Sequence, residues 1–193
     1  MTTVLLMGPP GAGKGTHAGH LAAHLGVPVI STGDLFRRNI ADGTELGKTA
    51  QGYLDAGEYV PDEVTNAMVR DRLAEADARP GFVLDGYPRT LDQAGVLDDI
   101  LDAQGRALDA ALVLQVEADA LVARLLRRAE IEHRTDDTED VIRRRFEVYH
   151  EQTAPLIHFY AARGIHHEVD ASADIDTVRA HVRQVAVQLK PAA

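Results

Sequence analysis

The sequence has no cysteine among its 193 residues. Disulfide bonds and zinc sites built on thiolates are therefore excluded, and the absence is typical of proteins of a reducing compartment. Long apolar runs are absent from the N-terminal region, where residues 4–7 are too few for the core of a signal peptide or for a membrane span. We therefore expect a cytoplasmic protein that does not associate with membranes.

Positively charged residues are fewer than negatively charged ones. The sequence has 20 Lys and Arg residues and 30 Asp and Glu residues, so the formal net charge is −10. A protein that grips nucleic acid needs a basic face, so we expect no nucleic-acid partner, although a local basic pocket is compatible with this charge. No low-complexity or linker-like stretch divides the chain, which predicts a single domain over residues 1–193.

Short apolar runs alternate with segments of helical periodicity along the whole chain. The runs that we expect to form strands are residues 4–7, 27–30, 82–85, 110–116 and 165–170. This alternation is typical of an α/β fold in which helices cover both faces of a parallel sheet. Ligands of such sheets bind at the carboxyl ends of the strands.

The most informative stretch is GPPGAGKGT at residues 8–16, between the first apolar run and a helix-like segment. Glycines let the backbone approach a phosphate closely, and the N–H groups at the helix start point toward it. Lys14 places a cation at the outer phosphates. Gly15 stands where the P-loop pattern has Ser or Thr, and the hydroxyl follows one residue later at Thr16. This departure matters because the Ser or Thr hydroxyl of the P-loop pattern binds magnesium. The alternative is a glycine-rich turn without a ligand.

A second stretch, FVLDGYPR, ends a buried run with a carboxylate at Asp85. This is the Walker-B arrangement, in which an acidic side chain beside the phosphate loop holds magnesium directly or through water. Gly86 and Pro88 form a turn that aims Arg89 into the same space. The alternative is that Asp85 only caps a helix.

Residues 31–34 form a polar turn that caps the next helix. Thr32 and Arg37 could face a common ligand there, or they could be a helix cap and a surface charge. Together with the Gly- and Asp-rich residues 42–65, this region makes a helical excursion longer than a crossover needs, and we interpret it as a candidate moving flap. His20 and His24 of the first helix have the i,i+4 spacing of metal ligands, but with no Cys and no acidic partner on that face we predict that they are solvated.

Arginines are concentrated between Arg124 and Arg145, although the chain is acidic. In the helix expected over residues 141–149, Arg145 borders the apolar stripe and Arg144 points away. We predict that Arg145 clamps a phosphate, because guanidinium groups match phosphate oxygens. We expect Arg143 and Arg144 to be solvated and neutralised by nearby acidic residues.

In the preceding helix, Arg128 lies nearest the apolar stripe, Arg124 is intermediate and Arg127 points outward. A short polar connection is expected over residues 129–137, and it carries Arg134. We predict that Arg128 and Arg134 clamp phosphates and that Arg127 is solvated.

Four stretches in order resemble the adenylate kinase family, in its short-lid bacterial form among nucleoside monophosphate kinases. They are GPPGAGKGT at 8–16, STGDLFR at 31–37, DGYPRTLDQA at 85–94 and RTDDTEDVIRRR at 134–145. The resemblance implies a P-loop three-layer α/β/α fold with a five-stranded parallel sheet. It also implies reversible phosphoryl transfer from Mg-ATP to AMP, giving two ADP, in adenylate energy homeostasis and in purine nucleotide salvage and interconversion.

The same resemblance assigns site residues. The residues implied to bind ATP are Gly11, Ala12, Gly13, Lys14, Gly15, Thr16, Arg124, Arg128 and the backbone near Ala173. Those implied to bind AMP are Thr32, Arg37, Glu58, Tyr59, Val60, Gly86, Tyr87, Pro88, Arg89, Gln93, Arg134 and Arg145. The implied catalytic residues are Lys14, Arg89, Arg134 and Arg145, and Asp85 would orient Mg²⁺ through water.

The resemblance further implies a monomer with an inserted AMP-binding region at about residues 31–60 and a short lid at about 127–137. Two departures stand out. His17 replaces a glutamine, and only residues 129–133 separate the positions of Arg128 and Arg134, so we expect no structural zinc.

Two other functions are compatible with these stretches. One is a kinase for another nucleoside monophosphate, such as UMP or CMP, although Thr32 and Gln93 favour adenine by resemblance. The other is a non-catalytic module that senses ATP, which would not require Arg89, Arg134 and Arg145.

Overall fold

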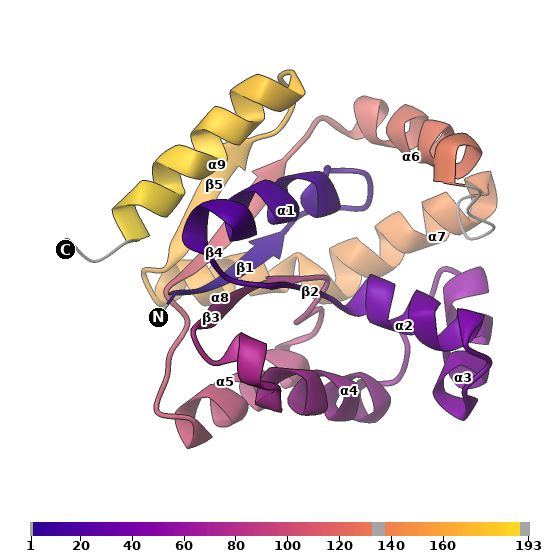
Figure 1. Ribbon diagram of the computed structural model, residues 1–193. Coiled ribbons are helices and arrows are strands. Elements are labelled where there is room, and N and C mark those ends of the chain that lie inside the picture. Colours follow the sequence, from indigo (N-terminus) through magenta and orange to yellow (C-terminus); the bar gives the residue numbers. More distant parts are fainter. Residues whose placement is uncertain (1, 133–137, 190–193) are drawn as a thin grey trace.

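The computed structural model describes residues 2–132 and 138–189. Within them a single parallel sheet has the strand order β2-β3-β1-β4-β5, with helices on both faces (Figure 1). The strands are β1 (Thr2–Met7), β2 (Val29–Ser31), β3 (Gly81–Asp85), β4 (Ala110–Gln115) and β5 (His166–Asp170). This confirms the predicted α/β/α fold with a five-stranded parallel sheet.

The central strands are buried on both faces, which explains why they read as unbroken apolar runs. Val4 and Leu6 of β1 join one core cluster, whereas Leu5 and Met7 join the other. This follows from the alternation of side chains along a strand. The register places Leu6 and Ser31 on either side of Asp85, so the ends of β1, β2 and β3 meet at one edge.

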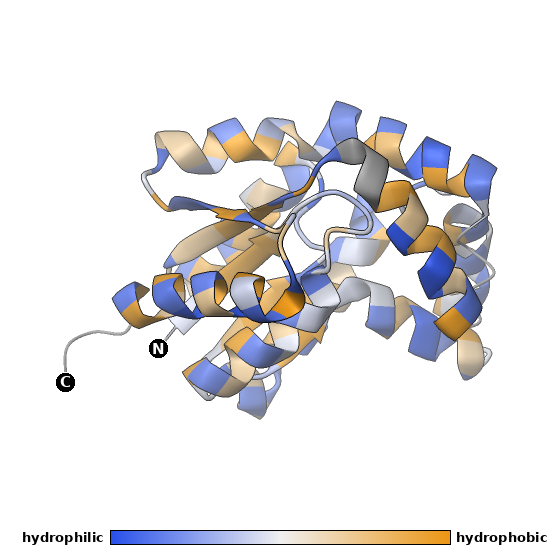
Figure 2. Ribbon diagram, turned by 90° about the horizontal axis from the view of Figure 1, so that it is seen from above, coloured by the Kyte–Doolittle hydropathy of each residue, from blue (hydrophilic) through white to orange (hydrophobic). Residues whose placement is uncertain are grey.

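Helices α1 (Lys14–Leu25), α6 (Ala118–Glu132) and α9 (Ile175–Leu189) contribute to the core cluster on one face. Helices α4 (Asp62–Ala74), α5 (Leu91–Ala103) and α8 (Pro155–Ala162) contribute to the cluster on the other face. Hydrophobic and hydrophilic residues alternate along these helices (Figure 2), as expected when one side faces the sheet. No helix in the described part of the chain is both long and apolar enough to cross a bilayer.

Between β2 and α4 the chain forms an excursion of two helices, α2 (Thr32–Ala41) and α3 (Glu45–Asp55). Ser31 caps α2 and Thr44 caps α3, each accepting a backbone N–H, at 3.3 Å and 3.0 Å. The excursion has its own small core of Phe36, Ala50 and Val60. Its side chains therefore pack mainly among themselves and against α4.

Helix α6 continues to Glu132, so the polar connection predicted to start at residue 129 starts later. Residues 129–132 are Ala, Glu, Ile and Glu, and nothing among them stops a helix. After the connection come α7 (Glu139–Val148), the π-helical turn η2 (Tyr149–Thr153) and α8. A short 3₁₀ turn, η1 (Ala76–Ala78), precedes β3.

Candidate active site

The glycine-rich turn joins β1 to the first residue of α1, Lys14. Gly11 and Gly13 have φ of +83° and +87°, a left-handed conformation that favours glycine. A Cβ on Gly8 would lie 2.7 Å from the carbonyl oxygen of Leu114 in β4. The turn can therefore be built only with glycine at these positions, and it presents the N-terminus of α1 as an anion site.

The ammonium group of Lys14 folds back over this turn. Its Nζ donates hydrogen bonds to the carbonyl oxygens of Gly8 at 2.8 Å and Pro9 at 3.0 Å. Burial lowers the pKa of Lys14 to about 8, the nearby carboxylate of Asp85 opposes this, and the charges of Arg89, Arg145 and Arg128 lower the pKa further. The low pKa therefore reflects mainly the burial of the ammonium and, to a smaller extent, the three arginines near it.

The carboxyl group of Asp85 lies at the end of β3, where it is buried and lines the same cleft as the glycine-rich turn. Burial raises the pKa of Asp85, while the charges of Lys14 and Arg89 act in the opposite direction. The following helix, α5, is capped by Thr90, whose Oγ1 accepts from the backbone N–H of Gln93 at 3.1 Å. Asp85 is therefore no helix cap, and that alternative is excluded.

The residues around Asp85 fit a magnesium ion that reaches the protein through water. Its Oδ2 lies 4.0 Å from the position a Cβ on Gly15 would take, which places it against the phosphate loop. Carboxylate and hydroxyl oxygens, here Asp85 and Thr16 of the same cleft, suit a hard cation that keeps several waters. In the described ranges, no group of three or more His, Cys, Asp or Glu residues forms a closed metal cage.

The turn after β3 is held by two residues that the resemblance assigns to AMP. Thr32 Oγ1 donates to the carbonyl oxygen of Gly86 at 2.8 Å. Gln93 Oε1 accepts from the backbone N–H of Arg89 at 2.7 Å, and its Nε2 donates to Asp62 Oδ1 at 2.6 Å. Both side chains are 1 % exposed. In this structure they shape the turn from beneath.

Two cavities meet above this turn. The larger is a cleft of about 980 Å³ and the smaller is a cavity of about 90 Å³. Among the residues that the structure describes, four cationic side chains line both cavities, and we call them the shared cations: Lys14, Arg37, Arg89 and Arg145. Any two anions placed in the two cavities would have these charges between them.

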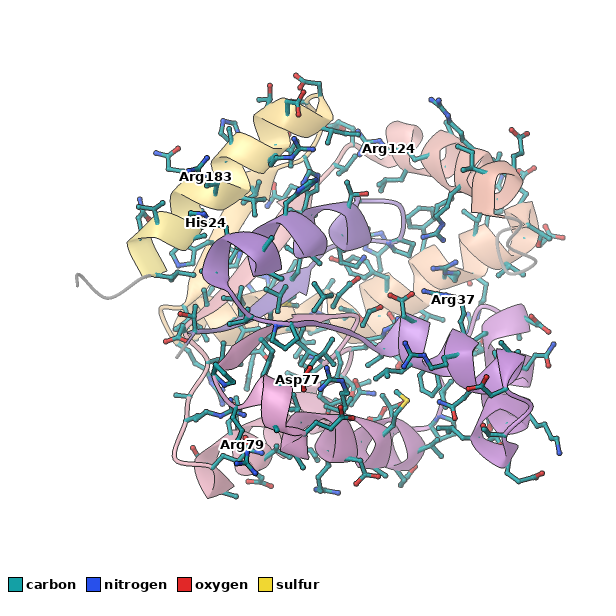
Figure 3. The ribbon with its side chains drawn as sticks, viewed as in Figure 1. His24, Arg37, Asp77, Arg79, Arg124 and Arg183 are labelled. Atoms are coloured by element: carbon teal, nitrogen blue, oxygen red, sulfur yellow. The ribbon has the colours of Figure 1, made fainter. Side chains whose placement is uncertain are left out.

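The remaining predicted site residues divide between the cavities. Those that line the cleft are Gly11, Ala12, Gly13, Gly15, Thr16, Arg124, Arg128 and Ala173, together with Asp85. Those that line the smaller cavity are Glu58, Tyr59, Tyr87 and Pro88, and Gly86 lines both. Figure 3 shows Arg124 on α6 and Arg37 on α2, on opposite sides of the glycine-rich turn. Val60 packs in the core of the excursion, and Arg134 lies outside the described residues.

One prediction about charged residues was wrong in part, and one histidine is buried without any signal in the sequence. His17, to which the sequence assigned no role, is only 4 % exposed on α1, which packs against α9, and burial lowers its pKa. Arg144 is not neutralised by its own hairpin alone, because its Nε donates to Glu58 Oε1 of the excursion at 2.6 Å. Arg143 does pair with Glu139 on its own helix, at 2.7 Å.

Three residues near the site carried no signal in the sequence. Asp62 accepts from Thr90 Oγ1 at 2.7 Å as well as from Gln93. Tyr149 and Thr153, both from η2, line the smaller cavity. Their positions depend on contacts with residues far away in the chain, which periodicity does not reveal.

The chain is similar to a known protein family and to several known proteins over most of its length. The family model described as "Adenylate kinase" matches residues 6–165. The chain is 56 % identical over 181 residues to the adenylate kinase of Nocardioides sp., covering 94 % of this chain and 95 % of that protein. It is 59 % identical over 178 residues to that of Kocuria rhizophila, covering 92 % and 95 %.

A third relative, the adenylate kinase of Thermobifida fusca, is 57 % identical over 175 residues, covering 91 % of this chain and 93 % of that protein. Residues 6–165, which match the family model, contain the residues that line the smaller cavity and most of those that line the cleft. This chain therefore belongs to the adenylate kinase family, the enzymes that transfer a phosphoryl group between ATP and AMP to give ADP.

Proposed function

We propose that this chain catalyses reversible transfer of the γ-phosphoryl group of ATP to AMP, giving two ADP, with ATP in the larger cleft and AMP in the smaller cavity. The observation that carries the proposal is the set of shared cations that line both spaces. Two nucleotides bound head to head would bring their phosphates together at this point.

On the donor side, the backbone N–H groups of residues 11–16 and the Lys14 ammonium hold the phosphates of ATP. Arg124 and Arg128 of α6 and the backbone at Ala173 lie beside the rest of the nucleotide, because all three line the same cleft. Arg124 also donates to the carbonyl oxygen of Ala171, at 3.2 and 3.3 Å, which ties α6 to the loop before α9.

On the acceptor side, Arg37 and Arg89 hold the AMP phosphate, and the turns at 58–60 and 86–89 form the walls of its cavity. In the present structure Arg37 pairs with Asp34 at 2.5 Å, one turn earlier on α2. Its guanidinium is available to phosphate at a small cost, because this pair is exposed. Thr32 and Gln93 support the turn from beneath, and they reach the adenine only if one of their internal hydrogen bonds opens.

The transfer step needs no strong general base, because the attacking oxygen of AMP is already anionic. The protein supplies positioning and neutralisation of the charge that builds up on the transferred group. Arg89, Arg145 and Arg134 bridge the phosphates in this proposal, and Lys14 follows the donor phosphates. Arginine suits this role because its planar fork contacts two phosphate oxygens at once.

Asp85 would hold the magnesium ion of Mg-ATP through water, and the ion would supply charge neutralisation at the phosphates. The excursion at about residues 31–60 and the lid at about 127–137 cover the nucleotides and keep water away from the γ-phosphate. We further propose that the enzyme acts as a monomer in the cytoplasm, in adenylate energy homeostasis and purine nucleotide salvage and interconversion.

The decisive experiment offers the purified enzyme Mg-ATP with AMP, UMP, CMP or GMP and identifies each product directly. We expect ADP from AMP at a rate far above the rates of the other acceptors. Preferred phosphorylation of UMP or CMP would replace the proposal by another nucleoside monophosphate kinase. ATP hydrolysis without AMP as fast as transfer would contradict the exclusion of water.

A further inference from the structure

Arg89, one of the shared cations, is fixed at three points of its own structure. Its Nε donates to the carbonyl oxygen of Gly86 at 2.7 Å, and its backbone N–H donates to Gln93 Oε1 at 2.7 Å. Its carbonyl oxygen accepts from Thr153 Oγ1 at 2.9 Å. The terminal nitrogens of the guanidinium therefore project from a residue whose backbone is held by two hydrogen bonds and whose side chain is held by a third.

Tyr59 contacts the guanidinium itself. The Cζ atom of Arg89 lies 4.7 Å from the centroid of the Tyr59 ring, within the range of a cation–π interaction. The ring lies against the guanidinium and so limits the directions in which the guanidinium can turn.

The hydroxyl groups of Tyr59 and Thr153 are 2.8 Å apart. Since the single hydroxyl hydrogen of Thr153 is donated to the carbonyl oxygen of Arg89, the hydrogen between the two hydroxyls comes from Tyr59. The contacts form a closed ring, from Tyr59 to Thr153, to the backbone of Arg89, and through its guanidinium back to Tyr59.

The three residues of this ring come from three separate segments. Tyr59 belongs to the turn that ends the excursion, Arg89 follows β3, and Thr153 is the last residue of the π-helical turn η2. A π-helical turn changes the direction of the side chains that follow it and is often found at functional sites. Here it directs Thr153, which is 6 % exposed, into the smaller cavity.

We propose that Tyr59 and Thr153 are positioning residues for Arg89, and that they set its guanidinium at the boundary between the two cavities. Because Tyr59 belongs to the excursion, Arg89 is held in this way only while the excursion is docked on the rest of the protein. The inference rests on the phosphate-bridging role proposed for Arg89. A misplaced guanidinium costs rate because transfer requires a near-attack geometry.

The test measures kcat and KM with saturating Mg-ATP and varied AMP for Tyr59→Leu, Tyr59→Phe and Thr153→Val, each alone and combined with Arg89→Ala. We expect Tyr59→Leu to lower kcat about tenfold, and Tyr59→Phe and Thr153→Val to lower it about threefold, because Tyr59→Phe keeps the ring over Arg89. In the Arg89→Ala background, Tyr59→Leu should change kcat by less than about twofold.

A matched control is Tyr53→Phe, which removes a hydroxyl from a tyrosine of the same excursion that is 39 % exposed, and which should leave kcat and KM unchanged. Unfolding temperatures of all variants are measured in parallel. If Tyr59→Leu fails to fold, Tyr59→Phe and Thr153→Val still test the ring of contacts.

Equal losses from Tyr59→Leu with and without Arg89 would overturn the inference, because the effect would then not pass through Arg89. A rise in KM for AMP with unchanged kcat would also overturn it, since Tyr59 would then act on the nucleotide directly. An Arg89→Ala variant with wild-type kcat would contradict the bridging role proposed for Arg89, and the inference would fail with it. This failure can be told apart from a failure of the inference alone, because it is seen without any change at Tyr59.

Discussion

Arg144 Nε and Glu58 Oε1 lie 2.6 Å apart, and this ion pair joins α7 to the turn that ends the excursion. The same turn contains Gly57, with φ of +74°, where a Cβ would lie 2.9 Å from the carbonyl oxygen of Val141. The turn therefore rests directly on the backbone of α7, the helix that also carries Arg145. The same contact surface therefore places both the wall of the smaller cavity, where we propose that AMP binds, and Arg145, one of the shared cations.

We predict that this ion pair supports AMP binding. Arg144→Glu should raise KM for AMP by a few-fold, and the double variant Glu58→Arg with Arg144→Glu should restore it. Because both side chains are partly exposed, the effect should shrink at high ionic strength. Steady-state kinetics at two salt concentrations measure both effects. Arg143→Glu is the control, because it alters an ion pair within α7 only. An equal rise in KM for AMP in this control would show that the effect comes from the change in net charge and not from the pair between Arg144 and Glu58.

Arg89→Ala and Arg145→Ala should each fold normally and lower kcat by a factor on the order of 10³, because the cation is needed mainly where charge is transferred. The comparison is Arg163→Ala, which removes an exposed arginine paired with Asp98 at 2.7 Å and should retain wild-type turnover. Circular dichroism checks folding and a coupled ADP assay measures kcat. Normal turnover in both Arg89→Ala and Arg145→Ala would refute the bridging of phosphates by these residues.

ATP binding should weaken as the pH rises through the pKa of Lys14, about 8 in the free enzyme. Below this pH the Lys14 ammonium is charged and favours binding of the ATP phosphates. Above this pH Lys14 is neutral in the free enzyme, and it must take up a proton when ATP binds. KM for ATP should therefore be constant up to about pH 8 and then rise toward tenfold per pH unit. In Lys14→Arg, whose guanidinium stays charged, KM should not depend on pH in this range; the same upturn there would assign it to another group.

The packing of α2 on α3 predicts a contrast between two glycines of α3. A Cβ on Gly47 would lie 2.2 Å from the carbonyl oxygen of Asn39, whereas a Cβ on Gly52 would meet no atom within 4 Å. Gly47→Ala should destabilise the protein by about 1–3 kcal/mol, through forced separation of the helices. Gly52→Ala should stabilise it by up to about 1 kcal/mol, through helix propensity.

Urea unfolding of the two variants gives the free energies directly. Both substitutions add the same methyl group to the same helix, so the difference between them isolates the contact with Asn39. Equal stabilities would show that α2 and α3 separate at no cost.

The glycine-rich turn, the five strands and the position of Asp85 could be predicted from the sequence because each depends on neighbouring residues. Unbroken apolar runs identify buried parallel strands, and glycines followed by Lys14 identify a turn that opens a helix. The burial of His17 could not be predicted, because it depends on residues far away in the chain. Periodicity assigns His17 to one side of α1, but it does not reveal that α9 packs against this helix.

The sequence by itself determined the order of the elements, the phosphate-binding turn and which arginines lie beside an apolar stripe, since all of these follow from local conformation. Only the tertiary structure decided that Lys14, Arg37, Arg89 and Arg145 line both cavities, and that Tyr59 and Thr153 hold Arg89 between them. Hydrogen bonds and cation–π contacts act over a few ångströms. Residues as far apart in the chain as Tyr59 and Thr153 come within that range only after the sheet and its helices have assembled.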